Sequence, residues 1–408
     1  MRTVPMGLDC VASALTRSGH QVQLLDLMQV EDIAGPVGEA IDGLRPEVIG
    51  ISLRNIDDQN MRSPRHFLDE ANEVIEEVKR FSSAPVVLGG AGYSIFPDAA
   101  LSRSRADMGI QGEGEEPLRL LLEKLERNQS LTGVPGLYVK GKGLQGPRTF
   151  VSELDQLPLP DPHLFISHGA AVLPIQTRRG CPMGCSYCST PAIEGTRMRK
   201  RSPERVVTWI TRLAEKGARQ LYFVDNTFNL PVSYAEQLCR DLISASLGLT
   251  WRCILYPLNI GESLVSAMAR AGCVEASIGL ESGCERMLRA MHKRFTLKDV
   301  AKTNHLLRKY GIRRMGFLLL GGPGESRQSV EESLAFADSL GLDFLKITVG
   351  IRIYPRTLLA EQARREGVIA AEDDLLFPRF YMTTGLDEWI RARVAAYAQD
   401  RPHCAIDR

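Results

Sequence analysis

Three cysteines stand close together in the segment RRGCPMGCSYCST, at positions 181, 185 and 188. Thiolates are soft, strongly donating ligands that suit iron–sulfur clusters and zinc. A structural zinc site normally takes four protein ligands. The nearest further Cys and His candidates are His163, His168, Cys239 and Cys253. Because none of these adjoins the three cysteines along the chain, the pattern favours a four-iron cluster with one iron left open. Zinc remains the alternative.

The residues around the cysteines suit a tight loop. Gly180, Pro182 and Gly184 allow the backbone to turn sharply and to come close to a cluster. Tyr187 stands directly before the last cysteine, and an apolar run at 171–177 precedes the loop. The cysteine loop is therefore expected to follow the end of a strand.

The elements that would position this loop alternate between strand and helix. Strands are expected at 171–177, 220–225, 251–255, 275–280, 315–320 and 344–350. Helical segments such as 203–217 and 330–341 fall between them. Six strand–helix units suit a partial or full (β/α) barrel, which builds its site at the carboxyl ends of the strands.

A second α/β unit is predicted ahead of the barrel. Short apolar runs at 21–27, 48–53 and 85–90 indicate buried strands, and 65–80 has the spacing of an amphipathic helix. Their alternation indicates a parallel, doubly wound (flavodoxin- or Rossmann-like) sheet. We expect this unit at 1–127, a Pro- and Gly-rich linker with a small hairpin at 128–170, the barrel at 171–370 and a tail at 371–408.

Composition excludes some classes of function. The 408 residues contain 50 Lys and Arg against 49 Asp and Glu, so no net basic field attracts nucleic acid. We expect no membrane span, because no run of about 18 uncharged apolar residues occurs. The N-terminal segment does not resemble a signal peptide, so the nine cysteines are expected to be reduced in the cytoplasm.

The segment CPMGCSYC resembles the cysteine signature of the radical S-adenosylmethionine (SAM) superfamily. The resemblance implies that Cys181, Cys185 and Cys188 hold a [4Fe–4S] cluster whose open iron binds the amino and carboxylate groups of SAM. It also implies an electron donor, such as flavodoxin or ferredoxin. Electron transfer from the reduced cluster would then cleave SAM to methionine and a 5′-deoxyadenosyl radical.

Three later segments are similar to family segments that contact SAM: DNTFN (225–229), SIGLESG (277–283) and GFLLLGGPGES (316–326). All three are expected at carboxyl ends of strands. The SAM-binding residues that the resemblance implies are Tyr187, Asp225, Asn226, Ser277, Glu281, Gly321, Gly322 and Pro323. The alternatives are a plain strand–turn–helix junction capped by Ser326 and a helix-capping role for Glu281.

The first unit resembles the cobalamin (B12)-binding domain of one subgroup of these enzymes, through segments 5–27, 50–55, 86–97 and 109–118. The implied cobalamin-binding residues are Ser52, Leu53, Arg54, Gly89, Gly90, Gly92, Gly112 and Glu113. No Asp-x-His-x-x-Gly motif occurs, so no histidine is expected to replace the lower ligand of cobalamin. The first strand of the sheet is expected to be missing. A flavodoxin-like sheet without a ligand is the alternative.

The resemblance implies cobalamin-dependent methylation of an unactivated carbon in a small molecule, natural product or lipid-like compound. Radical cyclisation or rearrangement without methyl transfer, methylthiotransfer and a non-catalytic cobalamin sensor are the alternatives. Methylthiotransferases carry further cysteines in the N-terminal domain, whereas Cys10 alone precedes Cys181 here. Candidate substrate contacts, each equally suited to a core or surface role, are Arg352, Tyr354, Arg356, Tyr381 and Trp389.

Overall fold

The N-terminal part of the chain folds around a five-stranded sheet in the order β1-β2-β3-β4-β5. The structure is a computed structural model that describes residues 4–28 and 30–407. Strands β1 (Ile49–Ser52), β2 (Val86–Gly89) and β3 (Met108–Ile110) are parallel. The hairpin β4 (Leu137–Val139) and β5 (Gly143–Leu144) continues the sheet in antiparallel fashion. The hairpin expected in the linker is therefore present, and it belongs to this first sheet.

Helices cover this sheet because their apolar residues recur every three or four positions. In α3 (Phe67–Phe81), the buried side chains are Leu68, Ala71, Ile75 and Val78, which share one face. The other helices here are α1 (Met6–Arg17), α2 (Ala34–Leu44), α4 (Ala91–Ile95), α5 (Pro97–Arg103) and α6 (Glu115–Glu126). The doubly wound prediction is confirmed, with strands 48–53 and 85–90 at β1 and β2.

The strand predicted at 21–27 is wrong. These residues form no ladder with any described strand, and β1 at the edge of the sheet pairs only with β2. An apolar alternation makes a strand only when a neighbour satisfies its backbone groups. No neighbour of that kind lies beside 21–27 among the residues that the structure describes.

The second sheet has seven parallel strands in the order β16-β13-β12-β11-β10-β9-β6. Its strands are β6 (Leu173–Ile175), β9 (Gln220–Phe223), β10 (Thr250–Leu255), β11 (Cys273–Glu281), β12 (Arg313–Leu320), β13 (Phe344–Val349) and β16 (Cys404–Ile406). The first six match the six predicted strands, and the partial barrel is confirmed. Strand β16 was not predicted, because three residues of the tail are too few to show a pattern.

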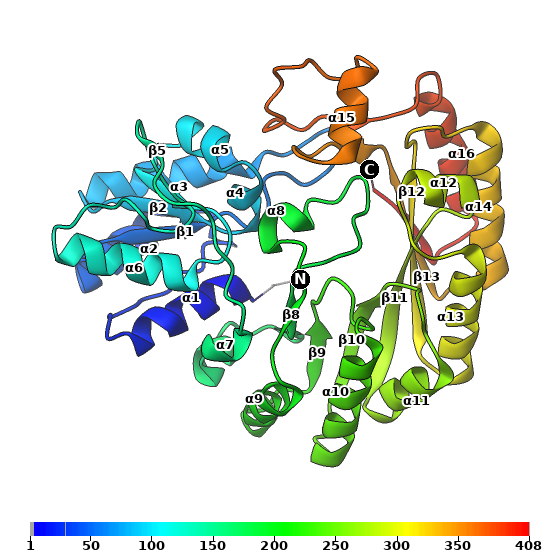
Figure 1. The fold of residues 1–408 in the computed structure, drawn as a ribbon, viewed down its shortest axis with the longest axis horizontal. Helices are drawn as coiled ribbons and strands as arrows, with labels where there is room; N and C mark the ends of the chain where they lie inside the picture. The colour runs from blue at the N-terminus through cyan, green and yellow to red at the C-terminus, as the bar shows by residue number, and fades with distance from the viewer. Residues whose placement is uncertain (1–3, 29, 408) are drawn as a thin grey trace.

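Helices line the outer side of this open barrel, while its inner side faces the N-terminal sheet (Figure 1). They include α9 (Pro203–Glu215), α10 (Val232–Ala245), α11 (Glu262–Arg270), α12 (Glu285–Ala290), α13 (Leu297–Lys309), α14 (Arg327–Leu340) and α16 (Asp387–Gln399). Short helices α7 (Pro162–Ser167), α8 (Thr190–Glu194) and α15 (Leu358–Arg365) lie toward the N-terminal part. Two small hairpins complete the fold, β7 (Arg178–Arg179) with β8 (Arg199–Lys200) and β14 (Ile351–Arg352) with β15 (Phe380–Tyr381).

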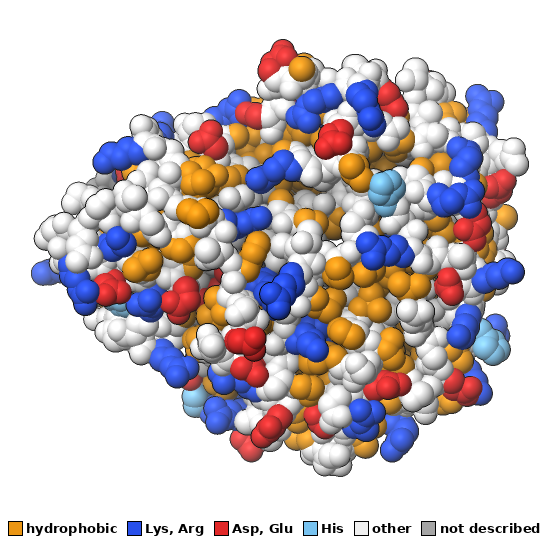
Figure 2. Space-filling view, viewed as in Figure 1, with side chains coloured by type: hydrophobic (Ala, Val, Ile, Leu, Met, Phe, Trp, Pro, Cys, Tyr) orange, Lys and Arg blue, Asp and Glu red, His pale blue; other side chains and the backbone are white. Residues whose placement is uncertain are grey.

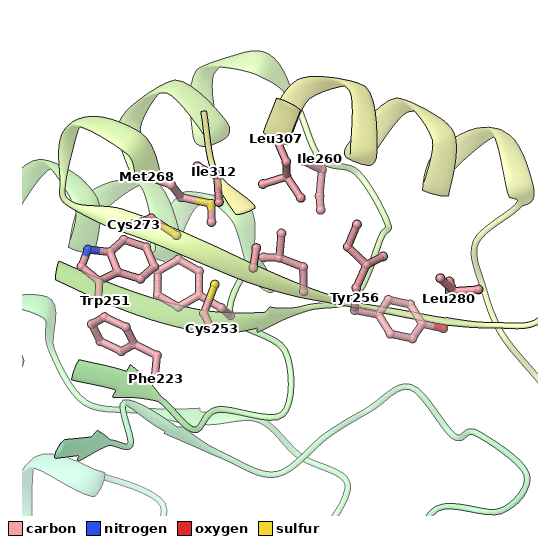
Figure 3. Packing of buried hydrophobic residues seen from close by; sticks show 14 of the residues in the cluster. Phe223, Trp251, Cys253, Tyr256, Ile260, Met268, Cys273, Leu280, Leu307 and Ile312 are labelled. Atoms are coloured by element: carbon pink, nitrogen blue, oxygen red, sulfur yellow. The ribbon is translucent and has the colours of Figure 1, made fainter. Parts of the chain in front are cut away.

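Aromatic packing holds the barrel strands against their helices. Phe223 and Trp251 are buried side by side with ring centroids 5.1 Å apart and nearly perpendicular, and Phe228 packs on both (Figure 3). Such pairs contribute about 0.5–1.5 kcal/mol beyond burial. The aromatic cluster joins the end of β9 (Phe223) to the start of β10 (Trp251), which fixes these neighbouring strands against each other.

The surface carries charges of both signs. Lys and Arg side chains are interspersed with Asp and Glu over the face in Figure 2, in keeping with the even totals in the sequence. Among the helices described, none is long and apolar enough to cross a membrane.

Candidate functional site

The cysteine loop leaves hairpin strand β7 and returns through α8 to β8. Gly180 has a left-handed φ of +86°, and a Cβ there would lie 2.1 Å from the carbonyl oxygen of Arg197. Gly184 also has a positive φ, +70°, with open space around it. Only glycine meets both demands at position 180, so the loop can turn tightly beside the returning strand.

The three thiols of Cys181, Cys185 and Cys188 are half-buried and act on one another electrostatically. Burial raises the pKa of the Cys181 and Cys185 thiols, and the neighbouring thiols raise it further. Within the described residues, no three His, Cys, Asp or Glu side chains surround one point as a single ion requires. A loop of three thiols with a glycine-permitted cradle fits an iron–sulfur cluster.

A buried lysine stands beside the second cysteine. Lys293 is 4% exposed, and its Nζ donates to Glu281 Oε1 and to the Tyr187 hydroxyl, each at 3.0 Å. Burial alone would lower the pKa of Lys293, but the charges of Glu281, Tyr187 and Cys185 raise it well above its ordinary value. The lysine therefore links the cysteine loop to the end of β11.

Glu281 and Tyr187, two predicted SAM-binding residues, are thus brought next to Cys185. Glu281 has a left-handed φ of +58° at an irregularity in the pairing of β11 with β12. Such strain in a non-glycine residue clusters at functional sites. Lys293 was missed, because the sequence MHKRF gives it no feature that separates it from surface cations.

Asp225, a predicted SAM-binding residue, is engaged by protein donors. Its carboxylate is 2% exposed and accepts hydrogen bonds from Thr177 N (2.8 Å), Thr177 Oγ1 (2.7 Å), Arg178 N (2.9 Å) and Arg178 Nη2 (3.1 Å). Four donors occupy both oxygens, so little capacity is left for a ligand. Asp225 instead fixes the segment that enters the cysteine loop.

Its neighbour Asn226 is exposed beside the loop. The side-chain amide of Asn226 donates to Glu194 Oε2 at 2.8 Å, and the same oxygen accepts from Gly180 N at 3.1 Å. Burial raises the pKa of Glu194, although these hydrogen bonds oppose the effect. Glu194 was not predicted, because it belongs to a short helix after the cysteines and meets Asn226 only through the fold.

Other predicted SAM-binding residues are covered by neighbouring parts of the protein. Ser277 is 8% exposed within β11, between β10 and β12. Thr383 covers the turn after β12, donating from N to Gly321 O at 2.9 Å and from Oγ1 to Gly322 O at 2.6 Å. Pro323 follows, half-buried, at the same turn. The carbonyl groups of this turn are thus engaged by the tail.

Ser326 caps α14, as the plainer interpretation of this turn expected. The Ser326 hydroxyl accepts from Ser329 N at 3.2 Å and forms a capping box. Met291 joins the turn to the cysteine loop, because its carbonyl accepts from Ser186 N at 3.1 Å and a Cβ on Gly322 would lie 3.6 Å from its methyl group.

The predicted cobalamin-binding glycines meet protein backbone. A Cβ at Gly90 would lie 2.6 Å from Leu53 O, and one at Gly92 would lie 2.6 Å from Asn55 C. Gly92 N also donates to the carbonyls of Leu53 and Arg54, both at 2.9 Å. These glycines bring the loop after β1 against the loop after β2. Ser52 and Gly89 end these strands as register partners.

Glu113, a predicted cobalamin-binding residue, is also engaged by protein groups. Its carboxylate accepts from Arg199 Nη1 at 2.5 Å and from Val151 N at 2.9 Å, and lies 3.3 Å from Arg179 Nη1. It therefore contacts the barrel hairpin. Gly112 beside it has a φ of +94°, and its N donates to Ser94 Oγ at 2.9 Å.

Two further buried ion pairs join the two parts of the chain. Glu115 accepts from Arg179 Nη2 at 2.6 Å, and Asp57 accepts from Arg352 Nε at 2.9 Å. Burial alone would raise the pKa of Glu115, but the charge and hydrogen bonds of Arg179 lower it overall. Buried ion pairs thus hold the N-terminal sheet and the barrel together.

The candidate substrate contacts make contacts within the protein. Arg352, Tyr354 and Tyr381 are buried. The guanidinium of Arg356 donates to Ile95 O at 3.4 Å, and Trp389 packs under Arg327. The contacts of these residues are those expected of core or surface residues, the roles left open by the sequence.

A pocket of about 310 Å³ adjoins the cysteine loop, lined by Arg148, Phe150, Glu194, Gly195, Arg197 and Arg199 among others. The carbonyl of Gly195 accepts from Cys181 N at 3.2 Å. Gly195, which lines the pocket, is thus hydrogen-bonded directly to the backbone of the first cysteine.

Comparisons with known proteins match both parts. Residues 175–337 match the radical SAM superfamily model, and residues 1–122 match that of the B12 binding domain. An uncharacterized methyltransferase of Pyrococcus horikoshii is 27% identical over 369 residues, which cover 88% of this chain and 78% of that protein. The tryptophan 2-C-methyltransferase of Streptomyces laurentii is 25% identical over 427 residues, covering 88% and 71%.

Solved structures share the fold across nearly the whole chain. The radical SAM methyltransferase TsrM from Kitasatospora setae superposes with a TM-score of 0.88 at 23% identity, covering 98% of this chain and 88% of that one. The cobalamin-dependent SAM radical enzyme OxsB gives 0.77 at 16% identity, covering 95% and 63%. With its cysteine loop on a partial barrel and a matching domain before it, the chain belongs to the radical SAM superfamily, in the subgroup that carries a B12-binding domain.

Proposed function

We propose that this chain is a cobalamin-dependent radical SAM methyltransferase that methylates an unactivated carbon of a small molecule or a lipid-like compound. One observation carries the proposal: the three-cysteine loop lies on a hairpin whose arginines are buried against the B12-binding domain. This arrangement brings the two cofactor-binding parts together, as a reaction that uses both cofactors requires. The methyltransferase relatives support methylation as the outcome.

The family models imply a [4Fe–4S] cluster, SAM and cobalamin as cofactors. When bound, the cluster supplies the electron that cleaves SAM and cobalamin supplies the methyl group. The chain's part is to hold the cluster through Cys181, Cys185 and Cys188 and to orient SAM near Tyr187 and Glu281. Because Lys293 is buried and cationic beside Glu281, it would fix this carboxylate and neutralise negative charge next to the cluster.

The polar pair Asn226 and Glu194 is proposed to offer hydrogen bonds to SAM, since Asn226 is exposed and Glu194 accepts from Gly180 N at the start of the cysteine loop. Cobalamin is proposed to lie along the carboxyl edge of the N-terminal sheet, near Ser52, Arg54 and Gly89. That edge is where doubly wound sheets bind their ligands. The domains proposed are 1–127, linker 128–170, barrel 171–370 and tail 371–408, with hairpin β4–β5 packed on the first.

A small acidic electron carrier, such as flavodoxin or ferredoxin, is proposed to reduce the cluster. The pocket with Arg148 and Arg197 supports this, since it is cationic and reaches Cys181 through the backbone of Gly195. We place the enzyme in the cytoplasm, where a flavodoxin and reduced thiols are available, and propose no nucleic-acid partner.

The test is anaerobic reconstitution with iron, sulfide and hydroxocobalamin, followed by incubation with SAM, a reductant and candidate substrates. We expect a broad visible absorption that Cys185→Ala abolishes, retained corrinoid, 5′-deoxyadenosine and a product heavier by one methyl group. Deoxyadenosine without retained corrinoid would remove the cobalamin part. Product without added mass would favour a rearrangement, and zinc bound in place of iron would overturn the proposal.

A further inference from the structure

Two carboxylates that follow β3 contact the β7–β8 hairpin, which carries the cysteine loop. Glu113 contacts Arg199 at 2.5 Å and Arg179 at 3.3 Å, and Glu115 contacts Arg179 at 2.6 Å. All four side chains are nearly buried, with exposed fractions of 4–9%. A buried charge that loses its partner is strongly disfavoured, so these groups stay together when either loop moves.

The two arginines hold both sides of the cysteine loop. Arg179 and Arg199 are register partners in the β7–β8 hairpin, and the loop with all three cysteines lies between them. Arg179 directly precedes Gly180 and Cys181, so a shift of its guanidinium moves the backbone of the first cysteine. Arg199 also donates from Nη2 to Glu194 O at 2.7 Å, which fixes the helix after the last cysteine.

Glu113 lies in the loop after β3, the third parallel strand of the N-terminal sheet, and Glu115 is the first residue of α6, which follows that loop. Gly112, which adjoins Glu113, is tied through its N to Ser94 of α4, after β2. The loops after β2 and β3 border the carboxyl edge at which cobalamin is proposed to bind. A ligand that orders this edge therefore acts on Glu113 and Glu115 through a short, packed path.

We propose that Glu113 and Glu115 are positioning residues that couple the cobalamin-binding edge to the cysteine loop, so that each cofactor strengthens the binding of the other. The inference rests on the proposed function. Coupling between two sites is reciprocal in binding free energy. We call the ion-paired group of Glu113, Glu115, Arg179 and Arg199 the clamp. Cobalamin that orders the clamp therefore favours the loop geometry that holds the cluster, and the bound cluster favours cobalamin by the same factor.

The molecule offers a matched control. Asp57 and Arg352 form another buried ion pair between the two parts, with exposed fractions of 0% and 2%. Arg352 lies in β14, after β13, and its guanidinium donates to Asp57, Ile353 O and Leu375 O. Asp57→Asn thus loosens the same domain contact without touching the clamp, whereas Glu115→Gln breaks the clamp with the same loss of charge.

The experiment measures the affinity for hydroxocobalamin of cluster-free and cluster-loaded protein, under anaerobic conditions, from the corrinoid left in an ultrafiltrate. We expect the loaded wild type to bind about fivefold more tightly or better. Glu115→Gln should lower this ratio to near one, and Asp57→Asn should keep the wild-type ratio. Glu113→Gln and the conservative Arg179→Lys provide second variants if Glu115→Gln does not fold.

Each outcome decides the matter. A wild-type ratio near one with corrinoid retained refutes the coupling and leaves the proposed function standing. A wild-type ratio that survives in both Glu115→Gln and Glu113→Gln refutes the role of these carboxylates. Equal loss in Asp57→Asn would show a general effect of the domain contact and also overturn the proposal. If no form retains corrinoid, the cobalamin part of the proposed function fails first.

Discussion

Replacing Lys293 by Met tests whether the buried lysine holds the end of β11 beside the cysteine loop. The substitution removes the donors to Glu281 Oε1 and Tyr187 and leaves the carboxylate, 15% exposed, without its cation. Breaking one side of a buried pair costs about 3–5 kcal/mol. We take about 3 kcal/mol, because the remaining exposure lets water reach Glu281.

For a domain of this size, each kcal/mol shifts the melting temperature by about 2–4 °C. Lys293→Met should therefore melt about 6–12 °C below the wild type. The assay is a near-ultraviolet circular dichroism melt of cluster-free protein at pH 7, so that loss of iron does not contribute. Lys309→Met is the control, since Lys309 pairs with Glu262 at the surface, where both side chains are half-exposed, and should shift the melt far less.

The double variant Lys293→Met with Glu281→Gln separates charge from packing. Removing both charges eliminates the unpaired carboxylate, so most of the lost stability should return. A double variant as unstable as the sum of the single variants would refute the electrostatic reasoning. A Lys293→Met melt no lower than that of Lys309→Met would refute the burial argument itself.

Three further comparisons between variants test the site. Gly180→Ala should bind much less iron per chain on reconstitution than Gly184→Ala, because both have left-handed φ but only position 180 has Arg197 O in the way, 2.1 Å from a Cβ. Asp225→Asn should lower stability by about 3 kcal/mol in thermal melts, because it leaves Arg178 buried and unpaired, whereas exposed Asn226→Ala should fold normally and bind SAM more weakly in equilibrium dialysis. The pKa of Glu115 is lowered in the folded protein, so its contribution is present above the ordinary value of about 4.3 and is lost as pH falls toward the folded value. Melts from about pH 5 down to about pH 3 should therefore fall more steeply for the wild type than for Glu115→Gln, and parallel curves over that range would contradict the ion pair.

The features that sequence predicted well are those that depend on local pattern. The six barrel strands, the α3 stripe and the Ser326 cap follow from periodicity and capping chemistry within a few residues. Segment 21–27 has the same alternation as a strand but forms none, because pairing depends on a neighbour that its own residues do not specify. Spacing alone located the cysteine loop, since its three cysteines lie within one short segment.

The ion pairs at the site could not be predicted from the sequence, for one physical reason. Resemblance assigned Asp225 to SAM and Glu113 to cobalamin, and in the structure each carboxylate is paired with an arginine. Arg178 and Arg199 lie 47 and 86 residues away from their partners, and Lys293 lies 106 from Tyr187. The residues next to a carboxylate in the sequence cannot show whether a distant arginine will form an ion pair with it.

Charge placement around the cysteines shows why so many of these long-range pairs meet there. Arg178, Arg179 and Arg199 surround the base of the loop, and each is matched by a buried carboxylate from another element. Lys293 matches Glu281 on the opposite side. Paired charges fix backbone positions without adding net charge, whereas unpaired ones would be driven toward water. A loop that must hold three thiols at set positions is thus fastened from both domains, which makes the geometry of the cluster site depend on the contact between them.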